Sequence, residues 1–367
     1  MSADVLIVGG GPAGLAAAIA ARMKNLRVAV IDPRHPPIDK PCGEGLLPEA
    51  VAALRILGIQ IDSSIAAPFA GFRFSDDSSS ASARISRGKA FGLRRTALHQ
   101  LLVDRAAELG VSLLWGSRLS SLDSHHVAVD GHLFPCKWIV GADGQNSSVR
   151  QSARLGQARY RPSRFGFRLH YAVAPWTDLV EVHWGEKSQM IVTPTSANEI
   201  CISLFSHDSH LRIGRALDQF PEVAVHLRGV RPISAEAGAV TSLGRARAVV
   251  RGNVALVGDA GCMVDAVLGQ GLSLAFQQAL HLADALASED LARYEIAHRR
   301  LTRVPIRMTR LMLLMNASTA LRRKVLRLFA ARPALFAKMI SIHTGNSESD
   351  ALNAAQILDL GWRVLFA

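Results

Sequence analysis

Three glycines near the start of the chain are spaced as a phosphate cradle requires. Gly9, Gly11 and Gly14 follow a short apolar run and precede an alanine-rich one. A strand, a glycine turn and a helix in this order place backbone N–H groups at the positive helix end, where a pyrophosphate can lie. Asp32 ends the next apolar run and is placed to accept hydrogen bonds from a ribose diol. The spacing therefore predicts a dinucleotide site.

Two later motifs also combine glycine with aspartate. They are GADGQNSSVR at 141–150 and VGDA at 257–260, the latter followed by GQG at 269–271. In this order and spacing the three motifs resemble the fingerprints of flavin-dependent monooxygenases of the p-hydroxybenzoate hydroxylase type. The resemblance spans roughly residues 4–287 and implies an α/β fold, with a Rossmann-like, GR2-type FAD-binding domain and a parallel sheet.

Two segments resemble one branch of this superfamily. The runs DKPCGEGL at 39–46 and VDAVLGQG at 264–271 are similar to geranylgeranyl reductases and polyketide-modifying hydroxylases. The nearest resemblance is to flavoprotein hydroxylases associated with type III polyketide synthases, which oxidise alkylresorcinol-type products. The chain departs from the common superfamily pattern at Cys262 and Ala266, where His and Pro are usual on the pyrimidine side of the flavin.

The resemblance implies a role toward FAD for each matching position. The first glycine turn would hold the pyrophosphate, Asp32 the adenosine ribose, and Arg95 the polar chain of the flavin. Asp259 would accept a hydrogen bond from a sugar or ribityl hydroxyl, and the N–H groups of 269–272 would face the isoalloxazine. The predicted FAD-binding positions are Gly9, Gly11, Pro12, Ala13, Gly14, Asp32, Arg34, Cys42, Gly43, Arg95, Leu119, Asp143, Asp259, Gly269, Gly271 and Leu272.

Three of these positions also have a purely structural explanation. Arg95, beside Arg94, could be an exposed arginine at a helix start. Asp143 could simply form a turn with Gly144. Cys42 lies between residues that let the backbone approach a flavin, so its thiol could be a small apolar contact, the favoured interpretation, or redox-active.

Candidates for proton transfer lie in the alternating segment 165–171. One face of this predicted strand carries Phe165, Phe167, Leu169 and Tyr171, and the other carries Gly166, Arg168 and His170. His170 or Tyr171 could take a proton from a phenol, although packing explains both residue types in a strand. The sequence leaves open which face lines the pocket. No residues are spaced as a metal site or a Ser-His-Asp triad.

The resemblance implies that the cofactor carries the chemistry. The predicted function is an FAD-dependent, NAD(P)H-consuming monooxygenase that hydroxylates a phenolic or polyketide-derived, alkylresorcinol-like substrate through a flavin C4a-hydroperoxide. No second glycine turn is present for nicotinamide, so NAD(P)H is expected to bind transiently. The alternative is a prenyl or geranylgeranyl-type double-bond reductase, which needs no oxygen. A halogenase lacks support because no Trp-x-Trp-x-Ile-Pro motif is present, and a non-catalytic FAD-binding protein would not need all three motifs.

The elements that position these residues follow from periodicity. Short apolar runs at 5–8, 27–31, 111–115, 138–140 and 254–257 predict buried strands, and 15–23, 96–109 and 271–286 predict helices. Asp130-Gly131 predicts a hairpin. Cys136 and Cys201 are expected in strands. Residues 291–343 are predicted to be helical, with breaks near Pro305 and Pro333.

These elements predict a discontinuous domain organisation. Residues 1–150 and 250–290 form the FAD-binding domain, 151–249 an inserted antiparallel substrate domain, and 291–367 a C-terminal helical region. The 39.5 kDa chain is long enough for these domains. Four cysteines without a framework pattern favour a reduced, cytoplasmic protein, and the N-terminus lacks a signal-peptide pattern.

The net charge of +12 lies mostly in one segment. Residues 293–338 contain twelve Lys and Arg but one acid, Glu295, interspersed with apolar clusters. This pattern predicts no nucleic-acid partner. It fits a small aromatic, polyketide or lipid-like substrate, with peripheral contact at the inner membrane face or with a partner enzyme. The alternative is that the apolar faces pack on the flavin domain, or cap the substrate pocket, while the arginines are solvated.

Overall fold

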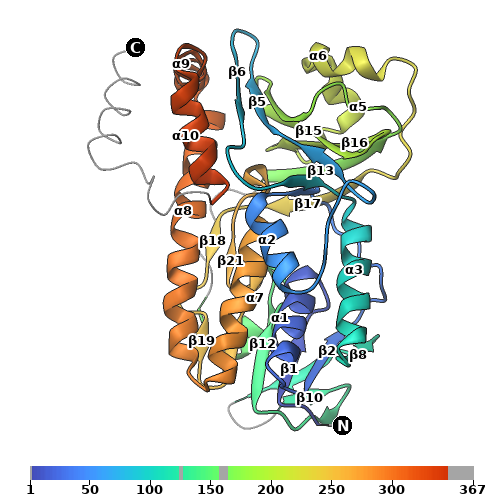
Figure 1. Ribbon diagram of the computed structural model, residues 1–367, viewed down its shortest axis with the longest axis vertical. Helices are drawn as coiled ribbons and strands as arrows, with labels where there is room; N and C mark the ends of the chain where they lie inside the picture. The colour runs from blue at the N-terminus through green and yellow to red at the C-terminus, as the bar shows by residue number, and fades with distance from the viewer. Residues whose placement is uncertain (1, 124–126, 157–163, 346–367) are drawn as a thin grey trace.

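The computed structural model describes residues 2–123, 127–156 and 164–345, so the end of the predicted helical region, 346–367, lies outside the described residues. Figure 1 shows a parallel sheet with its helices near the N-terminus, an antiparallel sheet at the opposite end, and helices α8 to α10 along one side. The fold predicted from the sequence is confirmed. Because the antiparallel sheet lies beyond one end of the parallel sheet (Figure 1), an edge of the parallel sheet and a face of the antiparallel sheet can contribute to one site between them.

A six-stranded sheet forms the frame of the nucleotide-binding part. Its order is β19-β20-β12-β1-β2-β8, and every neighbouring pair is parallel except β19 with β20. The carboxyl ends of β1, β2, β12 and β20 therefore meet at one edge, where ligands bind in such sheets. The bounds are β1 Val5–Val8, β2 Val28–Asp32, β8 Ser112–Trp115, β12 Trp138–Gly141, β19 Val250–Arg251 and β20 Val254–Leu256.

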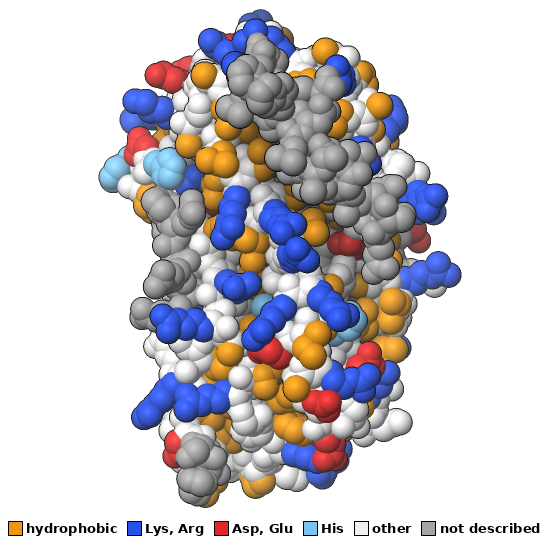
Figure 2. All heavy atoms as spheres, turned by 90° about the vertical axis from the view of Figure 1, so that its left-hand side faces the viewer, with side chains coloured by type: hydrophobic (Ala, Val, Ile, Leu, Met, Phe, Trp, Pro, Cys, Tyr) orange, Lys and Arg blue, Asp and Glu red, His pale blue; other side chains and the backbone are white. Residues whose placement is uncertain are grey.

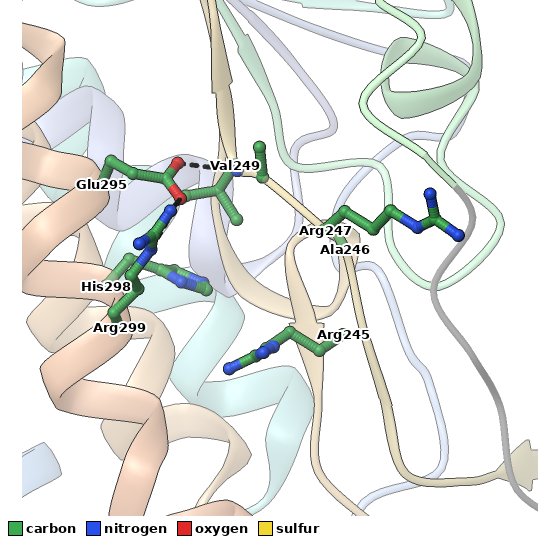
Figure 3. A pocket seen from close by; sticks show the side chains of 8 residues that line it. Arg245, Ala246, Arg247, Val249, Glu295, His298 and Arg299 are labelled. Atoms are coloured by element: carbon green, nitrogen blue, oxygen red, sulfur yellow. Dashed lines mark hydrogen bonds and ion pairs between the residues drawn. The ribbon is translucent and has the colours of Figure 1, made fainter.

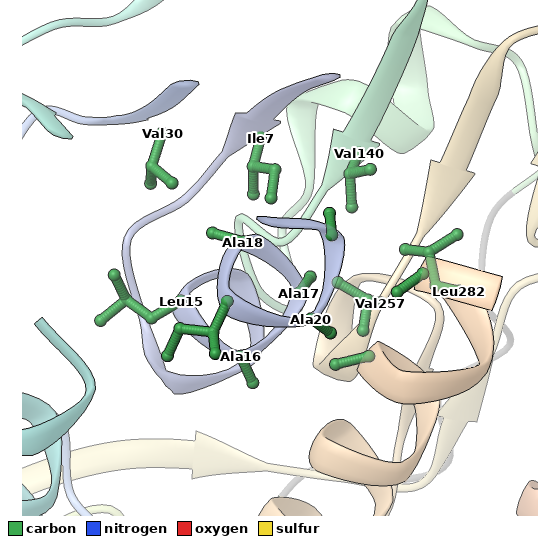
Figure 4. Close-up of a cluster of buried hydrophobic side chains, with 14 of the residues drawn as sticks. Ile7, Leu15, Ala16, Ala17, Ala18, Ala20, Val30, Val140, Val257 and Leu282 are labelled. Carbon is green, nitrogen blue, oxygen red and sulfur yellow. The ribbon is translucent and has the colours of Figure 1, made fainter. Parts of the chain in front are cut away.

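Small side chains let the first helix pack closely on this sheet. Figure 4 shows Ala17 and Ala20 of α1. On one side they face Ile7 and Val140 of the sheet, and on the other side they face Leu282 of α7. Alanine allows this close approach and also favours the helix itself. The helices of this part are α1 Pro12–Met23, α2 Pro48–Ile56, α3 Arg95–Glu108, α4 Ser148–Ser152 and α7 Gly271–Ala287.

The second large sheet has seven strands in the order β17-β13-β16-β15-β14-β5-β6. All its neighbours are antiparallel except β14 with β5. Two of its strands come from residues 71–84, within the segment that the sequence assigns to the FAD-binding domain, because β5 pairs with β14 across a long sequence separation. The bounds are β5 Gly71–Ser75, β6 Ser80–Arg84, β13 Arg164–Tyr171, β14 Leu179–Trp184, β15 Ser188–Ser196, β16 Glu199–Ser206 and β17 Ala237–Thr241.

Three helices follow α7: α8 Leu291–Ala317, α9 Thr319–Ala331 and α10 Pro333–His343. The predicted break at Pro305 is wrong, because α8 continues through it. A proline loses one helical hydrogen bond, and here packing of α8 on α7 and on the segment 266–268 keeps both halves aligned. Pro333 does begin a new helix, as predicted. In the described part of the chain, no helix has the length and hydrophobicity that crossing a bilayer requires.

Short elements complete the fold. The Asp130-Gly131 hairpin is confirmed, with both residues at positive φ. Cys136 lies in a loop before β12 rather than in a strand, whereas Cys201 lies in β16 as predicted. The remaining bounds are β3 Gly45–Leu46, β4 Ala67–Phe69, β7 Ala90–Gly92, β9 Leu119–Leu122, β10 Val127–Val129, β11 His132–Leu133, β18 Gly244–Arg245, β21 Cys262–Met263, α5 Ile213–Ala216 and α6 Pro221–Ala224.

Candidate functional site

The first glycine turn leaves an open concave surface at the N-terminus of α1. Gly9 has a φ of 112°, which favours glycine, and Gly14 packs so closely that an added Cβ would lie 1.9 Å from the Gly9 carbonyl oxygen. Gly11, by contrast, would meet nothing within 4 Å, and no side chain caps the helix start. Unused N–H groups therefore face open space, as pyrophosphate binding requires.

Asp32 orders the backbone beside this turn. Its carboxylate accepts hydrogen bonds from the Gly10 N–H at 2.9 Å and from the Arg34 N–H at 2.9 Å. His99 of α3 supports Gly10 from behind, with Nε2 2.8 Å from the Gly10 carbonyl oxygen. Burial lowers the pKa of His99, so the ring is neutral and can donate through Nε2 while Nδ1 accepts the Ile38 N–H. Sequence analysis missed His99, whose only signal is a polar residue on the buried face of a predicted helix.

Other predicted positions surround the same edge of the sheet. Arg95 begins α3, and its buried Nε has no partner among the described residues. Asp259, after β20, forms an ion pair with Lys40 at 2.8 Å. Added Cβ atoms on Gly269 or Gly271 would meet nothing within 4 Å. An unpartnered guanidinium nitrogen and open backbone surfaces are features that a bound polar ligand would complete.

Two predicted positions have evident structural roles. Asp143 accepts hydrogen bonds from the N–H groups of Ser148 and Val149, so one carboxylate oxygen serves the start of α4. Its other oxygen is buried and has no partner within residues 2–123, 127–156 and 164–345. Leu119 begins β9, four residues after Trp115, whose ring packs over Gly10. The remaining predicted positions lie in the first turns of α1 and α7: Pro12, Ala13 and Leu272.

A short loop connects the nucleotide-binding part to the seven-stranded sheet. Glu44 adopts a φ of 61°, unusual for a residue with a Cβ, and is almost fully buried. One carboxylate oxygen accepts the Arg95 N–H at 3.0 Å, and the other lies 2.7 Å from His170 Nε2. Cys42 is half-buried, and its sulfur accepts the Glu44 N–H at 3.4 Å. The loop is thus held by Glu44, with Gly43 against Ser203 of the sheet.

Two buried arginines on β13 hold the loops that flank the predicted flavin position. Arg168 forms ion pairs with Asp39 at 2.8 Å and Glu44 at 3.1 Å. Although burial disfavours its charge, these carboxylates raise the pKa of Arg168. Arg164, 1% exposed, pairs with Asp265, whose carboxylate also caps the segment before Gly269. Sequence analysis missed both roles, although their four-residue spacing in a strand places both arginines on one face.

The structure separates the two predicted proton-transfer residues. His170 is on the Arg168 face, buried, with Nδ1 3.0 Å from the Ser234 hydroxyl and Nε2 against Glu44. Tyr171 is on the opposite face, packed with Met190 and Ile202 in an apolar cluster. Burial raises the pKa of Tyr171, which makes it a poor proton acceptor. His170 therefore faces the flavin loops and Tyr171 does not.

The face that carries His170 changes from polar to apolar across the sheet. Residues directly opposite one another run from Arg168 through Ser203, Ile191 and Val182 to Phe74. Four interstrand spacings make this row about 19 Å long. Its apolar end borders a cavity beneath α8 to α10 that also reaches the segment before Gly269. The lining residues are Phe72, Phe74, Val182, Val267, Leu268, Met308, Leu311, Met312, Met315, Phe329, Phe336, Met339, Ile340 and His343.

The FAD binding domain family matches residues 2–291. The chain belongs to this family. It is a flavin-dependent oxidoreductase of the superfamily that contains monooxygenases and reductases, with FAD as its cofactor. Gly11, Arg95 and Gly271 fit FAD at the edge where the motifs converge. The two glycines offer open backbone surfaces, and Nε of Arg95 is buried without a partner among the described residues. The resemblance found from the sequence is confirmed at this level, whereas no finding links the chain to type III polyketide synthases.

Similar proteins include both reductases and hydroxylases. A menaquinone reductase of Mycobacterium tuberculosis is 26% identical over 80% of this chain and 78% of its own length. A digeranylgeranylglycerophospholipid reductase of Methanothermobacter thermautotrophicus is 27% identical over 84% and 83%. A 3-(3-hydroxy-phenyl)propionate/3-hydroxycinnamic acid hydroxylase of a Mycobacterium species is 30% identical over 40% and 29%. A flavoprotein/dehydrogenase of Cytophaga hutchinsonii shares the fold, with a TM-score of 0.80, 16% identity and coverage of 94% and 93%.

Proposed function

We propose that this oxidoreductase hydroxylates the phenolic ring of a lipid-like substrate. The observation that carries the proposal is the continuous sheet face from His170 and Arg168 to the apolar cavity at Phe74. A substrate with a hydroxylated ring and an apolar chain matches both ends of this face. Alkylresorcinol-like products of polyketide synthesis have that form, which agrees with the substrate class expected from the sequence.

His170 is fully buried, with Glu44 at Nε2 and the half-buried Ser234 hydroxyl at Nδ1. Under this proposal a proton from the ring hydroxyl would therefore pass to the imidazole through the Ser234 hydroxyl. Arg168, paired with two carboxylates, orients Glu44 and offsets its charge. The row beyond Ser203 is apolar and keeps water from the ring. When bound and reduced by NAD(P)H, FAD would supply the activation of oxygen. The overall reaction consumes the phenolic substrate, O2, NAD(P)H and one proton and forms the hydroxylated product, NAD(P)+ and water.

A second candidate function is reduction of a double bond in a lipid-like substrate. Its support is that the similar reductases extend over about four fifths of this chain, whereas the similar hydroxylase covers 40% of it. In either reaction the chain would enter at the apolar cavity, whose volume is about 40 Å³, by displacing the flexible methionine side chains of α8. In this case a hydride equivalent from NAD(P)H and one proton add across the double bond. NAD(P)+ is released, and no O2 is consumed.

Oxygen dependence separates the two candidates. Purified, FAD-loaded protein is supplied with NADPH and either a long-chain alkylresorcinol or a prenylated quinone, in air and under argon. If the protein hydroxylates the alkylresorcinol, one O2 is consumed for each molecule of product, and no hydroxylated product forms under argon. Equal turnover under argon, with a product two mass units heavier, would instead establish reduction. An alkylresorcinol that is neither bound nor oxidised contradicts the primary proposal.

A further inference from the structure

A second concave site lies behind the flavin edge, between α8 and the chain around β18 and β19. Its cavity volume is about 300 Å³, and its walls include Arg245, Glu295, His298 and Arg299. Figure 3 shows Arg245 extending toward the side of α8 that carries His298 and Arg299, whereas Arg247 points the other way. The apolar cavity at Phe74 has no lining residue in common with this site.

Positive charge exceeds negative charge in this cavity. Arg245 is exposed and has no carboxylate partner among the described residues, while Arg299 pairs at 3.1 Å with Glu295. The other oxygen of Glu295 already accepts the Val249 N–H at 2.9 Å. Glu295 is therefore fixed by the protein, and the guanidinium of Arg245 keeps its hydrogen-bonding capacity for a ligand.

A buried histidine of α8 also lines this cavity. His298 is 2% exposed, and its Nε2 has no partner in the described chain. Burial is the main cause that lowers the pKa of His298, to about 4. The nearby charge of Glu295 raises this pKa, whereas the charges of Arg245 and Arg299 lower it. The ring is thus neutral at pH 7, and Nε2 can donate one hydrogen bond. Buried polar atoms without partners are uncommon. This one lies against Gly261, behind the lining that carries the two arginines, where a small shift of the ring would bring its N–H to an anion.

We propose that this cavity binds a phosphate group of a ligand other than FAD. Guanidinium groups match tetrahedral oxyanions through paired N–H donors, and the His298 N–H would complete the contact. Behind the lining residues, Arg245 pairs with Cys262 of β21, and Gly261, two residues after Asp259, packs against Val249 and His298. The phosphate would therefore lie on the other side of the short segment that carries the predicted flavin contact.

The test is isothermal titration calorimetry of the FAD-loaded, full-length protein with inorganic pyrophosphate at low ionic strength. The pocket variant is Arg245→Gln with Arg299→Gln. Its matched control, Arg300→Gln with Arg303→Gln, removes the same charge from exposed positions of α8 outside the cavity. We expect at least tenfold weaker binding in the pocket variant, unchanged binding in the control, and unchanged flavin content in both.

Absence of pyrophosphate binding to the wild type, or equal weakening in both double variants, overturns the proposal. A second arm identifies the source of the phosphate group by sedimentation with vesicles of phosphatidic acid or of phosphatidylcholine. Loss of phosphatidic acid binding in the pocket variant alone identifies a lipid headgroup. A soluble phosphate ligand is identified by a different result. In that case the wild type binds pyrophosphate, and the pocket variant and its control bind the vesicles equally.

Discussion

The two ends of one sheet face differ in what holds them together. At the β13 end, Arg164 and Arg168 are buried with carboxylates, so ion pairs fix the flavin loops with defined geometry. At the β5 end, the contacts are apolar and include methionines of α8, which adapt to varied shapes. Under the proposed function, the polar end would orient a reacting group precisely. The apolar end, whose cavity has a volume of about 40 Å³, would accept a chain only as the methionine side chains of α8 move aside.

Both ends would act on a substrate only when FAD is bound, so loss of FAD gives the largest expected effect. Gly11→Val fits the observed φ of −73° and meets no neighbouring atom, yet it places a side chain where the pyrophosphate would lie. We expect at least about a hundredfold weaker FAD binding, near 2.8 kcal/mol, with the apoprotein still folded. Flavin absorbance after gel filtration and the melting temperature measure the two quantities. A variant that stays fully yellow contradicts the FAD site.

The polar end is tested by His170→Asn, which keeps a hydrogen-bonding side chain but removes the proton acceptor. We expect kcat for a phenolic substrate to fall about 10²- to 10⁴-fold, with little change in the KM of a long-chain substrate. The matched control is Tyr171→Phe on the opposite face, which should retain kcat. Steady-state kinetics and their pH profile provide the measurement. A larger loss in Tyr171→Phe than in His170→Asn would reverse the assignment of the two faces.

The apolar end is tested by filling its cavity. Met308 is half-buried and lines the cavity, so Met308→Trp should obstruct an alkyl chain at modest cost in stability. We expect KM for long-chain substrates to rise about 10- to 200-fold, while short-chain substrates are turned over as before. Arg307→Trp, on the exposed side of α8, is the control. An unchanged KM for long chains in Met308→Trp would place the chain elsewhere.

A pH effect on stability distinguishes the apolar end further. Burial lowers the pKa of His343 to about 4, below the ordinary value of 6.5. The unfolded chain therefore binds more protons between these values, and stability falls as the pH falls from about 6.5 toward 4. The expected loss is about 2 kcal/mol between pH 7 and pH 5 for this group. Urea unfolding should show a smaller loss in His343→Phe, and equal slopes in both proteins would count against burial of the neutral ring.

The basic outer surface of α8 bears on how a lipid-like substrate reaches the apolar end. Figure 2 shows Lys and Arg side chains spread over the face along α8 to α10, with apolar side chains between them. The inner faces of these helices pack in the cluster around Phe329 and Phe336, as one of the two interpretations of the sequence requires. Arg300, Arg303, Arg307 and Arg310 are exposed. Contact of these arginines with a membrane or a partner enzyme remains the prediction made from the sequence.

The nucleotide-binding frame could be predicted because its signals are local. Gly9, Asp32 and Gly271 each lie next to the strand or helix that positions them. Their distance along the chain from that element is therefore enough to predict where they lie in the fold. The substrate face could not be predicted in this way. Arg164 meets Asp265 and His170 meets Glu44 across more than a hundred residues, and only pairing of β5 with β14 brings Phe74 into line with Arg168. Alternation showed which residues share a face of β13, but not which face the flavin loops cover.

The most direct test of the account is kcat/KM for resorcinols of increasing alkyl chain length, measured as O2 and NADPH consumption by the FAD-loaded protein. The account predicts that kcat/KM rises with each added segment of chain until the cavity is filled. In Met308→Trp the rise should stop at a shorter chain, and in His170→Asn the whole curve should be lowered without a change of slope. A curve that is flat with chain length in the wild type, or a slope that changes in His170→Asn but not in Met308→Trp, would contradict the assignment of ring and chain to the two ends.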